Sequence, residues 1–299
     1  MSFVRNLTDS SIAQLQMGER DHVLTDADFQ ARGRYVKLDV RYNATLFDLL
    51  KDDVIKGDVF PAIRDNELHF YYKGGCLFKF VQGAYWRDDN YNLYSEGTAG
   101  LPYYEKAKKQ NENKYTNKKG GTTERQLLDK LYRYTYNPNL ESKVVVLDIE
   151  VNLKGNIGWG KKCDLVLFNT ESAEIMFVEG KVYSDKRVRR AEGYLPEVVE
   201  QVNVYTQALI EQHENIVEQY KRFVSTVNGL FGVTYSLPQR LLEPAKLLVY
   251  KTGGGMAKNV SHTVDVINAK LGASNVMWVK DGEPSLNEIW DALSTQNIR

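Results

Sequence analysis

The sequence has few of the residues that form disulfide frameworks or zinc sites. It contains two cysteines, Cys76 and Cys163, far apart in apolar stretches, and four histidines without ligand-like spacing. This use of cysteine is typical of buried thiols in a reducing compartment. A structural zinc site needs four clustered ligands, so the composition argues against one.

Long apolar runs and an excess of one charge are missing as well. The sequence has no stretch of about 18 uncharged apolar residues and no signal-peptide core. We therefore expect a cytoplasmic protein without membrane association. The 39 basic and 39 acidic residues cancel, so affinity for nucleic acid must come from local clusters of charge.

A compositional break divides the chain of 299 residues. Residues 105–121 are rich in lysine and asparagine and almost free of aliphatic side chains, which predicts a linker or loop. Its lysines would be solvated or would contact phosphates. We expect one domain over residues 1–104 and a second over residues 122–299.

The N-terminal domain mixes helix and strand patterns. Residues 44–55 have helical spacing, and residues 33–42 alternate like a strand. Two further strands, 67–72 and 76–81, are joined by Lys73-Gly74-Gly75 as a hairpin. This predicts a small α+β domain, for which a role in DNA binding or target choice is a hypothesis.

The second domain has a more regular pattern. Residues 123–134 and 196–230 are helical in spacing, and strands are expected at 143–152, 163–169, 173–181, 245–251 and 275–280. This order predicts an α/β fold with a mixed central β-sheet flanked by helices.

Charged residues interrupt two of these apolar strands. Asp164 lies in one strand, and Glu179-Gly180-Lys181 ends the next. Because side chains alternate along a strand, Glu179 and Lys181 face the same side. Folding gives no reason for this combination, whereas phosphodiester cleavage uses it.

Two helices offer polar groups on their apolar faces. Glu124 shares a face with Leu127 and Leu128, so it is either a favourable acid in the first helical turn or a site residue. Gln201 and Tyr205 belong to a core-facing row in the long helical region. Buried amides and phenols need hydrogen-bond partners, which a carboxylate or a phosphate would supply.

Taken in order, these features resemble the PD-(D/E)XK nuclease superfamily, RecB-like type. The matching elements are Glu124, Gly160-Lys161-Lys162-Cys163-Asp164, Glu179-Gly180-Lys181 and Gln201 to Tyr205. The resemblance covers roughly residues 122–255. It departs from the family in lacking a proline before Asp164 and in a glycine approach that is one residue longer. A restriction-endonuclease-like core is what the resemblance implies.

The resemblance also implies catalytic roles. Asp164, Glu179, Glu124 and the Gly180 carbonyl would bind Mg²⁺, for which Mn²⁺ would substitute. These are the hard oxygen ligands that Mg²⁺ prefers. Lys181 would orient the attacking water and offset negative charge at the phosphorus.

Other polar residues around this site have less specific roles. Gln201 and Tyr205 would orient the substrate or the ligands, and Lys161 and Lys162 would contact backbone phosphates. Glu150 is the alternative third acid. It would share a strand face with Asp148, and that face is either solvated or turned to the site.

The sequence thus predicts a Mg²⁺-dependent deoxyribonuclease, a hydrolase that cleaves DNA with metal-activated water. The alternative is a catalytically weak or inactive nuclease-fold module that binds nucleic acid or assembles with a DNA-processing or defence complex. RNA as a substrate, oligomers and a protein partner all remain open.

Overall fold

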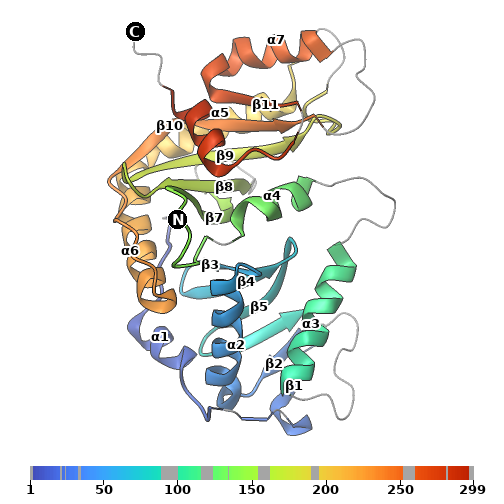
Figure 1. The fold of residues 1–299 in the computed structure, drawn as a ribbon, viewed down its shortest axis with the longest axis vertical. Coiled ribbons are helices and arrows are strands. Elements are labelled where there is room, and N and C mark those ends of the chain that lie inside the picture. Colours follow the sequence, from blue (N-terminus) through green and yellow to red (C-terminus); the bar gives the residue numbers. More distant parts are fainter. Residues whose placement is uncertain are drawn as a thin grey trace.

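The computed structural model describes residues 3–20, 22–23, 25–32, 35–88, 100–115, 124–133, 135–153, 162–189, 195–251, 260–280 and 282–295. Within these ranges the chain forms two β-sheets with helices packed around them, which is an α/β fold (Figure 1). No helix in the described part of the chain is long and apolar enough to span a membrane.

The N-terminal half forms a six-stranded sheet in which all neighbours are antiparallel. Its order is β1 (Phe29–Arg32), β2 (Tyr35–Leu38), β6 (Ala84–Asp88), β5 (Gly75–Val81), β4 (Glu67–Tyr72) and β3 (Val59–Ile63). Helices α1 (Asp9–Leu15), α2 (Asn43–Lys56) and α3 (Gly100–Tyr115) accompany it. The predicted helix at 44–55 and the hairpin at 67–81 are confirmed, whereas the strand expected at 33–42 gives way to a short 3₁₀ turn at Val40–Tyr42.

The loop predicted from residue 105 is wrong as far as residue 115, because these residues continue α3. Tyr103, Tyr104, Ala107 and Asn111 are buried at helical spacing. Tyr103 and Tyr104, which anchor the helix, precede the polar residues that begin at 105. Those polar residues by themselves show no apolar pattern of helical spacing. Residues 116–121 lie outside the described residues.

The C-terminal half forms a five-stranded mixed sheet, as predicted. Strands β7 (Val144–Asn152), β8 (Lys162–Asn169) and β9 (Glu174–Val182) run antiparallel, and β10 (Arg240–Tyr250) and β11 (Val276–Val279) add in parallel. The flanking helices are α4 (Glu124–Tyr132), α5 (Glu197–Glu211), α6 (His213–Phe231), α7 (Val260–Leu271) and α8 (Leu286–Ser294). The long helical region is divided at Gln212 into α5 and α6. Because helices cover this sheet, the middle of β8 and β9 is continuously buried rather than alternating.

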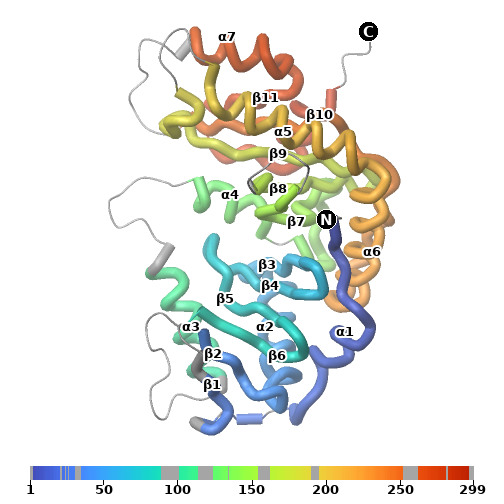
Figure 2. The backbone as a smooth tube through the Cα atoms, turned by 180° about the vertical axis from the view of Figure 1, so that it is seen from behind, coloured from blue at the N-terminus to red at the C-terminus, as the bar shows by residue number. Residues whose placement is uncertain are grey.

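The two halves share one hydrophobic core. The Phe60 ring of β3 lies 5.0 Å from that of Tyr132 on α4 and 5.7 Å from that of Tyr136. The N-terminal segment runs back beside α6 (Figure 2), where the Asn215 side chain donates a hydrogen bond to the Phe3 carbonyl at 3.1 Å. Helix α4, which carries Glu124, thus packs against β3 of the N-terminal sheet as well as against β7 and β9.

A buried ion network also joins the halves. The Asp148 carboxylate on β7 contacts the guanidinium groups of Arg5 at 2.7 Å and Arg64 at 2.6 Å. Asp148, which follows a register shift in the strand after Val146, is fully buried, so neither alternative for its face holds: it is not solvated and it does not line the site pocket. Burial raises the pKa of Asp148, but the two arginines outweigh it and the pKa is lowered.

Candidate active site

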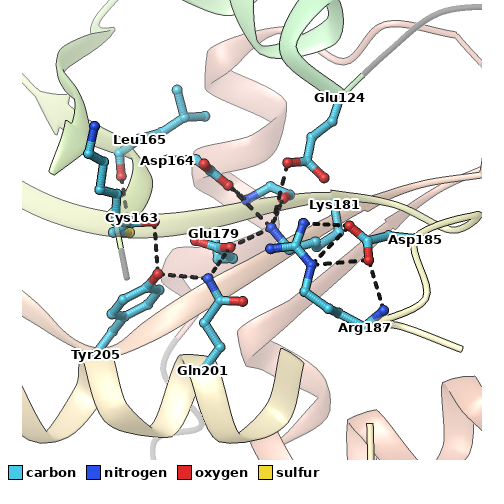
Figure 3. A network of polar contacts seen from close by, with 12 residues as sticks. Glu124, Cys163, Asp164, Leu165, Glu179, Lys181, Asp185, Arg187, Gln201 and Tyr205 are labelled. Atoms are coloured by element: carbon cyan, nitrogen blue, oxygen red, sulfur yellow. Dashed lines mark hydrogen bonds and ion pairs between the residues drawn. The ribbon is translucent and has the colours of Figure 1, made fainter. Parts of the chain in front are cut away.

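Four elements, β8, β9, α4 and α5, meet at the candidate site (Figure 3). Strand β8 contributes Asp164, β9 contributes Glu179 and Lys181, and α4 begins at Glu124. Helix α4 can lie close to β9 because Gly180 has no side chain. A Cβ at that position would be 2.7 Å from Cδ2 of Leu128. This close approach brings Glu124 to the end of β9.

The Lys181 ammonium lies among three carboxylates. Its Nζ is 3.6 Å from Asp164 Oδ2 and 3.7 Å from Glu124 Oε1, and it donates a short hydrogen bond to Glu179 Oε1. It also donates to the Gly180 carbonyl at 2.7 Å. The structure thus brings together the four predicted catalytic residues and the predicted carbonyl ligand.

Burial raises the pKa of each of these three carboxyl groups. Desolvation, reinforced by the charge of Asp164, raises the pKa of Glu179 to about 8. Desolvation also raises the pKa of Asp164 and of Glu124, although Lys181 acts in the opposite direction. For Lys181, burial lowers the pKa but the surrounding carboxylates outweigh it, so the pKa is raised. Lys181 therefore stays an ammonium ion at neutral pH.

One carboxylate oxygen of this group has no hydrogen-bond partner in the described part of the chain. Glu179 Oε2 is buried without a hydrogen bond among the described residues, whereas Oε1 accepts one from Gln201 Nε2 at 2.6 Å. A buried polar atom without a partner is costly, so it indicates a missing ligand. A proton or a cation would fill that place.

No three His, Cys, Asp or Glu side chains of the described ranges are arranged to hold a metal ion as they stand. The Lys181 ammonium lies between the acids and is the cation that they contact. Binding of a divalent ion would therefore require this lysine to give up at least part of its contacts.

Gln201 and Tyr205 lie behind the carboxylates and are buried. Gln201 Nε2 donates to the Tyr205 hydroxyl at 2.7 Å, and that hydroxyl donates to the Lys162 carbonyl at 2.8 Å. This chain of hydrogen bonds fixes Glu179 and the start of β8. Direct substrate contact by this pair stays a prediction.

The structure distinguishes the two candidates for the third acid. Glu124 is within 3.7 Å of the Lys181 ammonium. Glu150 instead contacts Lys162 at 3.1 Å and Arg125 at 3.5 Å. Glu124 is therefore the third carboxylate at Lys181.

The basic residues predicted to flank the site are only partly described. Lys162 is exposed and borders the site pocket, which encloses about 200 Å³. Lys161 and Gly160 lie outside the described residues. Arg187 and Glu197 also line this pocket. Neither residue was among the predicted site residues.

Comparison of the chain with protein-family models, with curated proteins and with solved structures finds no match.

Proposed function

We propose that this protein is a metal-dependent nuclease that hydrolyses phosphodiester bonds of DNA. The observation that carries the proposal is the convergence of Glu124, Asp164 and Glu179 on the Lys181 ammonium in one pocket. The element order supports a restriction-endonuclease-like core. Helix α4 precedes the antiparallel strands β7, β8 and β9, and α5 leads to the parallel strand β10.

The residues present fit a divalent cation. Asp164, Glu179, Glu124 and the Gly180 carbonyl offer hard oxygen ligands for Mg²⁺ or Mn²⁺. The unpartnered Glu179 Oε2 and the raised pKa of the Glu179 carboxyl group both indicate that negative charge here lacks compensation. When bound, the ion would polarise the scissile phosphate and lower the pKa of a coordinated water.

The protein's own groups would position the reactants. Lys181 stays protonated, so it would act as a hydrogen-bond donor that orients the attacking water and offsets charge at the phosphorus, not as a base. Gln201 would keep the Glu179 carboxylate in place. Arg187, fixed by Asp185 at 2.5 Å, stands at the pocket wall where a phosphate oxygen would approach.

The test is Mg²⁺-dependent cleavage of a panel of single-stranded, duplex and circular DNA by wild type and by Lys181→Ala. We expect cleavage by the variant to fall about 10²–10³-fold, which is typical when a positioned charge-stabilising donor is removed. Lys270→Ala is the matched control, because Lys270 is an exposed lysine at the end of α7. Undiminished cleavage by Lys181→Ala would show that the site is elsewhere.

A second candidate function follows from the same ammonium. Because Lys181 compensates part of the negative charge without a metal, the domain could keep this fold as a nucleic-acid-binding or assembly module that does not cleave. Calorimetric titration with Mn²⁺ separates the two functions. Carboxylate-dependent metal binding, lost in Asp164→Asn, favours the nuclease. Its absence, even with DNA present, favours the module.

A further inference from the structure

A larger cleft lies beside the site pocket. It encloses about 470 Å³ and is lined from both halves of the chain. The lining residues that matter here are His69, Tyr71 and Lys79 from the N-terminal sheet, and Arg125, Glu150 and Lys162 from the nuclease-like half. We call it the inter-sheet cleft.

The inter-sheet cleft is predominantly basic. Five cationic side chains line it against two acidic ones, Asp65 and Glu150. Four of the cations are already in ion pairs, Arg5 and Arg64 with Asp148, and Arg125 and Lys162 with Glu150. Lys79 is exposed on β5, and none of the ion pairs within the described ranges includes it. A polyanion would therefore find charge here that the protein itself does not neutralise.

The inter-sheet cleft leads to the candidate active site. Lys162 borders both. Arg125 and Glu150 also border a smaller pocket of about 110 Å³, whose other walls include Glu124 and Asp164. The three hollows thus lie next to one another between the N-terminal sheet and the carboxylates.

Size and lining favour one kind of ligand. The volume falls within the ~300–1,000 Å³ of pockets that hold small molecules, so the cleft has room for a nucleotide or two but not for a duplex. Phe3, His69 and Tyr71 also line the cleft, but each is more than nine-tenths buried, so their rings are not open to base stacking. A single strand would be held here through its backbone phosphates.

The wall formed by the N-terminal sheet is fixed relative to the site. The Gly74 amide, in the turn between β4 and β5, donates to Asp129 Oδ1 of α4 at 2.8 Å. A Cβ on Gly74 would be 2.4 Å from Cγ of Arg125, so glycine lets the arginine stem lie against the turn. The same helix carries Glu124, which couples the cleft to the catalytic carboxylates.

We propose that the inter-sheet cleft binds a single-stranded segment of DNA next to the scissile phosphate, with Lys79 contacting the backbone. The N-terminal half is then part of the substrate-binding surface and directs the enzyme to single-stranded or frayed ends. This inference rests on the proposed function only in placing the scissile phosphate at Lys181.

Fluorescence anisotropy in EDTA tests the inference without cleavage. The probes are a short single-stranded DNA, a hairpin duplex and a single-stranded RNA of the same sequence. The proteins are wild type, Lys79→Gln and, as the control, Lys270→Gln. Loss of one phosphate contact should reduce the salt slope for single strands by about 0.7 and weaken binding about five-fold at about 0.1 M salt.

We expect wild type to bind single-stranded DNA more tightly than duplex. Affinity for the single strand should fall in Lys79→Gln and not in Lys270→Gln, and the three proteins should have equal melting temperatures. An unchanged salt slope in Lys79→Gln, or duplex binding as tight as single-strand binding, would overturn the proposal. Tighter RNA binding with the same loss would overturn DNA as the occupant. Lys79-dependent binding without Mg²⁺-dependent cleavage would refute the nuclease alone, whereas cleavage with Lys79-independent binding would refute the cleft alone.

Discussion

Replacement of Lys181 by methionine in metal-free protein removes the ammonium group that contacts the buried Glu179 and the partly exposed Asp164 and Glu124. Methionine keeps most of the volume, so the change is mainly one of charge. Removing one partner from a buried ionic group costs about 3–5 kcal/mol, because the remaining charge is uncompensated. That cost applies only while the carboxylates are ionised.

The loss of stability in Lys181→Met should depend on pH. A carboxyl group whose folded pKa is raised stabilises the protein fully below its unfolded pKa, and this contribution is lost as pH rises through the folded pKa. For Glu179 this window runs from the ordinary value of 4.5 to about 8. Without Lys181 the folded pKa of Glu179 rises further. The loss of stability in Lys181→Met should therefore be small at about pH 5.5 and approach the full cost at about pH 8.5.

Urea unfolding in EDTA at the two pH values measures this difference. Lys246→Met is the control, because Lys246 is also buried but bonds to the Asn275 amide oxygen at 2.6 Å instead of to a carboxylate. Burial lowers the pKa of Lys246 to about 8, so wild type gains stability as pH rises from there toward 10.5. In Lys246→Met this gain of stability with rising pH should be absent. If Lys181→Met lost as much stability at the lower pH as at the higher, the proposed charge balance would be refuted.

Two further predictions concern residues that support the site. Gly180→Ala places a Cβ against Leu128 and should cost about 1–3 kcal/mol in urea unfolding. In the double variant with Leu128→Ala part of that cost should disappear, and strict additivity of the two changes would argue against the contact. Gln201→Leu removes the donor to Glu179 and should weaken Mn²⁺ binding about 10–100-fold in calorimetry. Gln207→Leu, on the exposed side of the same helix, should bind as wild type does, and equal loss in both variants would contradict the role of Gln201.

The carboxylates and their lysine could be predicted because short-range rules place them. Strand alternation puts Glu179 and Lys181 on one side, and the short connection after Asn169 pairs β8 with β9. Helical spacing likewise placed Glu124 and Gln201 on inward faces. The mixed sheet flanked by helices followed from the order of these elements.

Features that depend on distant parts of the chain could not be predicted. The burial of Asp148 depends on Arg5 and Arg64, which neutralise it and lie more than 80 residues away in sequence. The inter-sheet cleft likewise exists only where the β4–β5 turn meets α4. No local sequence pattern predicts such contacts, because each wall of the cleft, taken alone, has the sequence of an ordinary protein surface.

The Asp148 network limits where the chain can be divided. A fragment that starts near residue 122, where the composition changes, would keep Asp148 and lose both of its arginines. It would also uncover Tyr132 and Tyr136, which Phe60 now covers. The C-terminal half is therefore not expected to fold by itself. Recombination that exchanged the first hundred residues would have to transfer the two guanidinium groups with them, so the two halves are expected to evolve and unfold as one cooperative unit.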